Sequence, residues 1–160
     1  MEYPQRKQIR LTDYDYSLPN AYFITICTHK RKNLFWTTVG AIIDRPCNVP
    51  LTKYGKIVEN CIHEISLHYP LISVDHYVIM PDHIHLLLQI HGDDNGRSLS
   101  APTISRVIRH MKSTVSKQAG VSIWQKGFYD HVVRNMEDYR EIWEYIEANP
   151  GKQTELSLNL

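Results

Sequence analysis

His83 and His85 stand two residues apart in a segment that otherwise has the composition of a β-strand. Side chains two apart on a strand point to the same face of the sheet, so the two imidazoles would lie side by side. The alternate positions are all apolar: Ile84, Leu86, Leu88 and Ile90. Neutral imidazole is the commonest protein metal ligand. The pattern therefore indicates a metal or catalytic site on one face, or else two ordinary half-buried histidines.

The bulk properties of the chain limit the class of protein. Its 160 residues fit one domain over 1–160, with an N-terminal arm over 1–20 and a C-terminal tail over 151–160. The chain has no run of 18 apolar residues, so no membrane span is expected. Its first residues lack the apolar stretch of a secretory signal. A cytoplasmic location is the default expectation. Three cysteines without CxxC spacing favour neither a disulfide framework nor a cysteine zinc site.

The hydrophobic periodicity predicts seven elements that could position the histidines. Strands are expected over 22–28, 71–80, 83–91 and 128–133, and helices over 52–69, 103–119 and 136–149, with a small hairpin between 30 and 52. Pro150-Gly151 is expected to close the last helix. The order of the first six elements predicts an α+β, ferredoxin-like (RRM-like) fold with an antiparallel sheet. Its helices would cover one face, which leaves the other for the histidine pair and the last helix.

The last helix carries the residues that could complete a site. Tyr145 and Asn149 are four residues apart and share a face, while Ile142 and Ile146 would pack onto the body of the domain. A tyrosine could serve as a nucleophile and an asparagine amide as a ligand. An interior tyrosine is more often a core residue with its hydroxyl tethered, and an asparagine before a proline is more often a helix stop signal.

Several stretches of this chain resemble one family when they are taken in order. The run Tyr77–His85 resembles the histidine-hydrophobe-histidine signature of the single-tyrosine HUH transposases of insertion sequences. The following runs are similar to the REP-associated tyrosine transposase branch of that superfamily: Ala21–Thr28, Trp124–His131, Asp138–Arg140, Tyr145-Ile146 and Asn149-Pro150. Together they extend from about residue 20 to residue 150.

This resemblance implies roles for individual residues. His83 and His85 would hold a divalent metal, and Asn149 would supply a third ligand through its amide oxygen. Tyr145 would attack a DNA phosphorus, become linked to the 5′ phosphate and leave a free 3′-OH, so that strands could be rejoined without a nucleotide cofactor. Mg²⁺ is the expected cellular ion, whereas Mn²⁺ could bind more tightly in vitro because imidazole favours softer metals. Gln125 and His131 lie in matching motifs without an assigned role.

The resemblance also implies single-stranded DNA beside a hairpin as the substrate. The net charge is only +1, but a nearly neutral chain can carry a basic groove. The candidate phosphate-binding residues are Arg6, Lys7, Lys30, Arg31, Lys32, Arg106, Arg109 and Lys112. These clusters could equally be solvated faces of helices and loops. The sequence leaves open whether the protein acts as a monomer or a homodimer.

Two other functions compete with this one. In the first, the protein is a metal-dependent nuclease or hydrolase in which water attacks and Tyr145 is structural. In the second, it is a domesticated DNA-binding protein that has lost catalysis. The presence of His83, His85 and Tyr145 argues against the second.

Overall fold

The computed structural model describes residues 20–37, 50–92 and 102–158 of the chain. Its helices and strands, in chain order, are β1 (Ala21–Cys27), the short 3₁₀ helix η1 (His29–Arg31), α1 (Lys53–His68), β2 (Ile72–Ile79), β3 (His83–Ile90), α2 (Ile104–Ala119), β4 (Tyr129–Val132) and α3 (Met136–Leu158). The seven elements predicted within these residues all form, with ends mostly within one or two residues of expectation. The hairpin expected between 30 and 52 falls largely on residues outside the described ranges.

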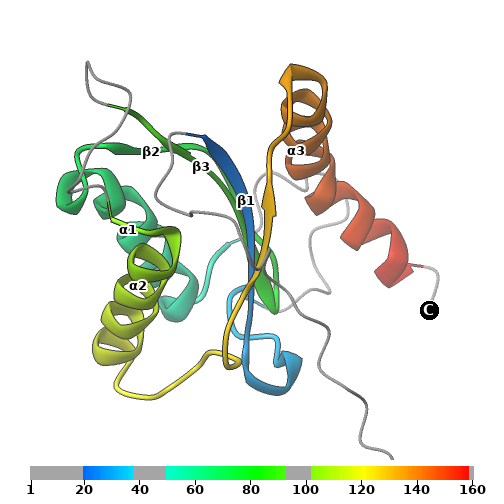
Figure 1. Cartoon of the computed structure of the whole chain (residues 1–160). Helices are drawn as coiled ribbons and strands as arrows, with labels where there is room; N and C mark the ends of the chain where they lie inside the picture. The colour runs from blue at the N-terminus through cyan, green and yellow to red at the C-terminus, as the bar shows by residue number, and fades with distance from the viewer. Residues whose placement is uncertain (1–19, 38–49, 93–101, 159–160) are drawn as a thin grey trace, which may run out of the picture.

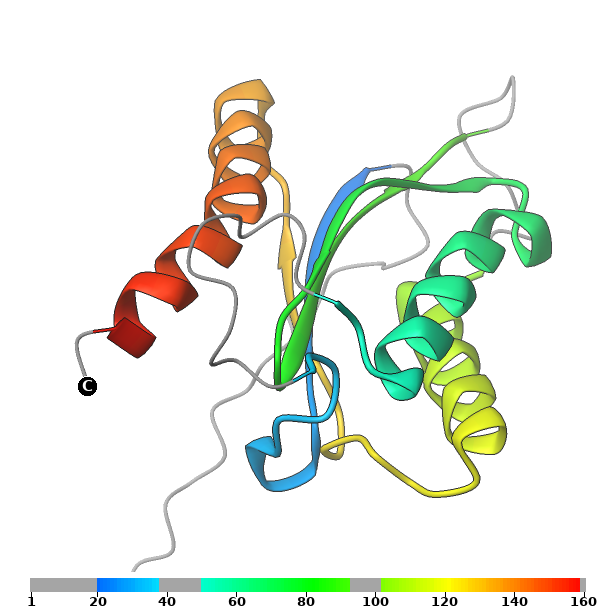
Figure 2. The same cartoon turned by 180° about the vertical axis from the view of Figure 1, so that it is seen from behind.

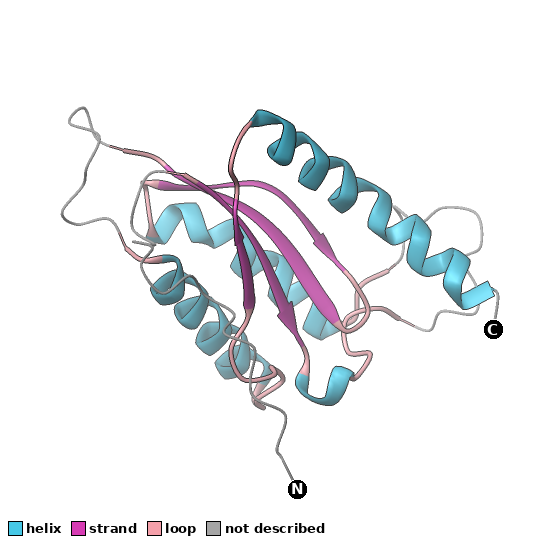
Figure 3. Cartoon of the chain, turned by 45° about the vertical axis from the view of Figure 1, so that its right-hand side comes forward, coloured by secondary structure: helices cyan, strands magenta, loops and turns pink. Residues whose placement is uncertain are grey.

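Four strands form an antiparallel sheet in the order β2-β3-β1-β4. β1 and β3 therefore lie in its centre, and β3 carries the histidine pair. Helices α1 and α2 lie together on one face of this sheet, and α3 lies on the opposite face (Figures 1 and 2). The result is an α+β fold in which α3 has its own face of the sheet, as Figure 3 shows from a third direction.

The helix ends follow from local chemistry. Thr52 and Thr103 cap α1 and α2, because each hydroxyl accepts a hydrogen bond from a main-chain N–H in the first turn. Gly120 ends α2 in the left-handed conformation, with φ of 73°, which glycine adopts without steric cost. Thr52, Thr103 and Gly120 can all be recognised in the sequence. They set the starts of α1 and α2 and the end of α2.

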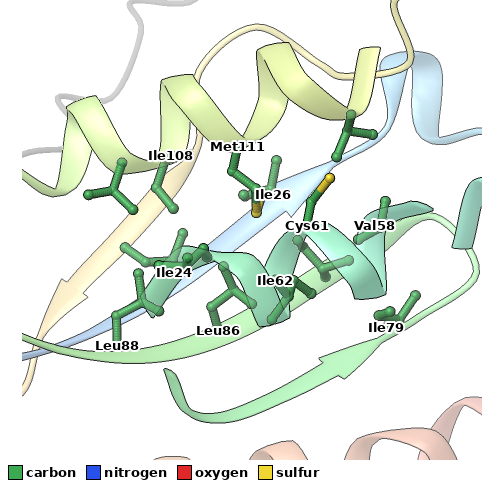
Figure 4. Packing of buried hydrophobic residues seen from close by; sticks show 14 of the residues in the cluster. Ile24, Ile26, Val58, Cys61, Ile62, Ile79, Leu86, Leu88, Ile108 and Met111 are labelled. Atoms are coloured by element: carbon green, nitrogen blue, oxygen red, sulfur yellow. The ribbon is translucent and has the colours of Figure 1, made fainter. Parts of the chain in front are cut away.

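The main core lies between the sheet and the α1–α2 layer. Alternate residues of the central strands, such as Ile24, Ile26, Leu86 and Leu88, are fully buried there against α1 and α2 (Figure 4). A smaller apolar cluster lies on the opposite face, beneath α3, and consists of Ala21, Leu87, Val133, Ile142 and Ile146. The alternation along β1 and β3 thus sends one set of side chains to each core.

The end of α3 differs from the prediction. Pro150-Gly151 was expected to close this helix at Asn149, but the helix continues to Leu158. A proline withdraws its own N–H and disfavours helix at the preceding residue, yet the residues that follow still supply donors. The prediction that Pro150-Gly151 ends the helix is therefore wrong.

No helix in the described ranges is long and apolar enough to cross a membrane.

Candidate active site

The two histidines lie together on the face of the sheet that α3 covers. Their ring centroids are 4.8 Å apart and the ring planes meet at 75°. His85 is buried, with 5% of its surface exposed, and the His83 side chain is 11% exposed. The expected side-by-side placement is confirmed, because the residues between and beyond them, Ile84 and Leu86, turn to the other core.

Each imidazole is anchored through the same ring nitrogen. His83 Nδ1 lies 2.6 Å from Asp82 Oδ1, and His85 Nδ1 lies 2.8 Å from Thr25 Oγ1. An imidazole that donates its Nδ1–H presents Nε2 as an acceptor. His85 Nε2 is buried and has no hydrogen-bond partner in the described part of the chain. Metal-binding histidines in proteins are usually held in this way, through the nitrogen that does not bind the metal.

Burial keeps both rings neutral near pH 7. Desolvation, with smaller contributions from the charges of His83 and Arg31, lowers the pKa of His85 to about 3. Desolvation also lowers the pKa of His83, although the hydrogen bond to Asp82 opposes this shift. A neutral imidazole has the free lone pair that metal coordination requires.

Tyr145 packs directly on this pair from α3. Its ring centroid lies 5.5 Å from that of His85 and 6.0 Å from that of Phe23. Phe23 in turn stacks on His85, with centroids 5.2 Å apart. The tyrosine remains 43% exposed, so a macromolecular substrate could reach it.

Asn149 lies one turn beyond Tyr145 and is buried, with 9% of its surface exposed. It continues the stripe of Ile142 and Ile146, which pack beneath the helix. Its amide Nδ2 is buried without a hydrogen-bond partner among residues 20–37, 50–92 and 102–158. Because an amide can turn by 180° without changing shape, either its oxygen or its nitrogen can face the unpaired position.

These donors fit a divalent metal. A neutral imidazole offers one unprotonated nitrogen, and two such nitrogens with an amide oxygen are ligands that Mn²⁺ and Mg²⁺ accept. Within the described ranges, no group of three or more histidine, cysteine, aspartate or glutamate side chains is arranged to hold a metal ion. A metal centre here would therefore depend on the Asn149 amide and on oxygens from the substrate.

Polar contacts fix α3 to the edge strand β2. A β-bulge interrupts the β2–β3 register at Asp75, and the Tyr139 hydroxyl donates to Asp75 Oδ2 over 2.7 Å. His76, the next residue, stacks on Trp143 with centroids 4.4 Å apart. The start of α3 is tied to β4, since His131 Nε2 lies 2.8 Å from Asp138 Oδ2. These contacts join the first turns of α3 to β2 and β4.

The structure separates the predicted phosphate-binding residues. Arg106 and Arg109 are exposed on α2, on the opposite face of the sheet from Tyr145 (Figure 2). The Lys112 ammonium is already engaged, because it donates to the main-chain oxygens of Gln125 and Gly127.

Near the histidines, Lys30 lies within η1 and Lys32 directly follows it, and both are exposed, while Arg31 pairs with Asp82. Gln125 exposes its side chain on the connection that precedes β4. Arg6 and Lys7 lie outside the described residues.

Sequence reasoning missed three residues of this site. Asp82 directly precedes His83, so its carboxylate was visible as a neighbour. Thr25 and Phe23 come from β1, and their proximity to His85 depends on the β1–β3 register, in which Thr25 is opposite His85. A register between strands about sixty residues apart has no local signal.

Three proteins of known sequence are similar to this chain over much of its length. An uncharacterised protein of Haemophilus influenzae is 32% identical over 91% of this chain and 88% of its own length. A second protein of that organism, named "Putative REP-associated tyrosine transposase", is 25% identical over 86% of this chain and 74% of its own. The REP-associated tyrosine transposase of Escherichia coli is 29% identical over 64% of this chain and 58% of its own.

A solved structure shares the fold. It is a REP-associated tyrosine transposase bound to a REP hairpin, and it matches with a TM-score of 0.62 and 24% identity over 89% of this chain and 74% of that chain. A search of protein-family models found no match.

Proposed function

We propose that this chain is a REP-associated tyrosine transposase, like the relatives to which it is similar, and that it cuts and rejoins single-stranded DNA beside a hairpin through Tyr145. The contact of the Tyr145 ring with His85, 5.5 Å between centroids within one chain, is the observation that carries the proposal. This contact would set a nucleophile of the right type against His85, whose ring lies 4.8 Å from that of His83. The partial exposure of Tyr145 gives a DNA strand access to it.

In the proposed reaction the Tyr145 Oη attacks a backbone phosphorus in line with the 3′ oxygen. The Oη–P bond forms, the P–O3′ bond breaks, and the phenolic proton is passed on so that the 3′ oxygen leaves as a hydroxyl. The DNA then carries a 5′ phosphate esterified to the tyrosine. The reverse attack by a 3′-OH restores a phosphodiester, so no nucleotide cofactor is needed.

His83, His85 and Asn149 would hold the divalent ion in this proposal. Such an ion, when bound, polarises the scissile phosphate and stabilises charge on its oxygens. In this proposal Thr25 and Asp82 accept the Nδ1–H of the two rings, so that each ring presents Nε2. Phe23 packs against both His85 and Tyr145 and would limit water around them. Mg²⁺ would be the cellular ion and Mn²⁺ the more convenient one in vitro.

The substrate assignment rests on the relatives. One similar protein is described with a REP hairpin bound, and we extend hairpin binding to this chain. The exposed cations Lys30 and Lys32 lie at the loop beside β1 and could contact phosphates near the site. Arg106 and Arg109 could serve only DNA that passes the opposite face of the sheet, and Arg6 and Lys7 remain candidates.

We also assign the domain to the ferredoxin-like class. Two features support this: the element order βαββαβ before α3, and a sheet whose central strands are β3 and β1.

A denaturing gel with a labelled hairpin oligonucleotide and Mn²⁺ tests the reaction. The wild-type protein should give a covalent protein–DNA adduct, and Tyr145→Phe should give none, because only the hydroxyl is lost. Tyr139→Phe is the matched control: it removes a hydroxyl from the same helix, one that is bonded to Asp75. We expect this control to retain the adduct.

The same gel separates the competing functions. Cleavage that persists in Tyr145→Phe would establish hydrolysis by water in place of tyrosine attack. Binding without cleavage under any divalent metal would establish a DNA-binding protein without catalysis.

A further inference from the structure

We propose that Asp82 and Arg31 are positioning residues that hold the His83 ring with Nε2 toward the reacting phosphate, and that Arg31 is not a DNA contact. This inference rests on the proposed function, since the proposed function gives His83 its role as a metal ligand. It also revises the prediction that Arg31 tracks DNA phosphates.

Three side chains form a continuous chain of contacts behind His83. The His83 Nδ1 lies 2.6 Å from Asp82 Oδ1, and the other carboxylate oxygen, Oδ2, lies 2.9 Å from Arg31 Nε. The Arg31 guanidinium donates through Nη1 to Cys27 Sγ over 2.7 Å. Cys27 is directly opposite His83 in the β1–β3 register, so the contacts return to the strand next to the histidine.

The main chain of Asp82 is also fixed. Its carbonyl oxygen accepts from both the N–H and the hydroxyl of Thr28, over 2.9 and 3.1 Å, and Thr28 is fully buried. The neighbouring Pro81 carbonyl accepts from Leu34 and Phe35. The segment that contains η1 therefore surrounds the connection between β2 and β3 and leaves the Asp82 carboxylate little freedom.

The backbone is left-handed at Arg31, whose side chain reaches Asp82. Lys30 and Arg31 both have φ of 54°, and they are the non-glycine residues with positive φ in the described part of the chain. Left-handed backbone at a residue with a side chain persists only where its surroundings determine it, and such positions cluster at functional sites. Here the strained turn delivers a guanidinium to the carboxylate that orients His83.

This arrangement has a chemical consequence for His83. A carboxylate that accepts the Nδ1–H fixes the tautomer and makes Nε2 a better electron donor. Arg31 occupies the second carboxylate oxygen, which leaves Asp82 a single oxygen for the imidazole. The guanidinium charge also balances the Asp82 charge, so that the carboxylate repels an approaching phosphate less strongly.

Two measurements on the full chain test the inference. Nitrogen-15 NMR of the histidine rings at pH 7.5 reports which nitrogen of His83 carries the proton, and Mn²⁺ titration by electron paramagnetic resonance reports ion affinity. We expect the proton on Nδ1 in the wild type. Asp82→Ala should shift it toward Nε2 and weaken Mn²⁺ binding 10- to 100-fold, the range typical of lost partners behind metal ligands.

Matched variants separate positioning from DNA contact. Arg31→Gln should weaken Mn²⁺ binding several-fold, whereas Lys32→Gln, which removes a cation from the next position, should leave it unchanged. Should Asp82→Ala fail to fold, Asp82→Asn keeps the shape and an accepting oxygen but loses the charge, and it should weaken Mn²⁺ binding to an intermediate degree.

Three results would overturn the inference: a wild-type His83 protonated on Nε2, an Asp82→Ala protein with wild-type ion affinity and tautomer, or an Arg31→Gln protein that loses DNA affinity with no change in Mn²⁺ binding. A wild-type protein that binds no Mn²⁺ would instead contradict the metal centre in the proposed function. The NMR result would then still decide whether Asp82 orients the ring.

Discussion

Asn149 is a buried amide that follows the buried Ile142 and Ile146 along α3, and its Nδ2 finds no partner in the described ranges. An unsatisfied buried polar group costs about 1–3 kcal/mol. A position selected for folding alone would carry an apolar residue, which supports the proposal that Asn149 is a metal ligand.

Replacing this amide should therefore stabilise the folded protein and weaken its binding of metal. Asn149→Leu keeps branching at the same carbon, and we expect the free energy of unfolding without metal to rise by about 1 kcal/mol, while Mn²⁺ affinity falls at least tenfold. Denaturant unfolding and Mn²⁺ titration measure the two effects. Ala148→Leu, at the exposed neighbouring position, should change neither. An Asn149→Leu protein that is destabilised, or that binds Mn²⁺ normally, would contradict the ligand role.

At the scale of elements, the loop around η1 holds strain that its sequence does not reveal. Lys30 has φ of 54°, whereas Lys32 has φ of −69°. Left-handed backbone costs a residue with a Cβ about 1–2 kcal/mol, and glycine is free of that cost.

Glycine should consequently be better tolerated in place of Lys30 than in place of Lys32. We expect Lys30→Gly to have a free energy of unfolding about 1–2 kcal/mol higher than Lys32→Gly, by urea denaturation. Both variants lose one lysine, so their difference reports the backbone alone. Equal stabilities would mean that the turn carries no such strain.

The elements themselves were largely predictable, for local reasons. Apolar residues at helical spacing, a threonine cap and Gly120 define α2, and apolar residues at every second position from Ile84 to Ile90 define β3. The end of α3 was not predictable from Pro150, because a stop signal competes with the donors that follow it. The partners of the histidines depend on the register of β1 against β3, which packing across the whole sheet decides.

For the whole molecule, the central feature is the division of the sheet into two faces. One face forms the main core with α1 and α2, and the other carries both histidines beneath α3 (Figure 1). Tyr145 and the imidazole that it contacts, His85, belong to one chain. The same face also carries Tyr129, which is 50% exposed and opposite Thr25 in the register. A second phenol is therefore available on this side.

Identification of the residue that becomes attached to DNA is the most direct test of the account. The adduct formed with a hairpin oligonucleotide and Mn²⁺ would be digested with nuclease and protease, and its peptides sequenced by mass spectrometry. We predict a nucleotide joined through its 5′ phosphate to Tyr145. Attachment to Tyr129 or Tyr139, or efficient cleavage with no modified tyrosine, would contradict it.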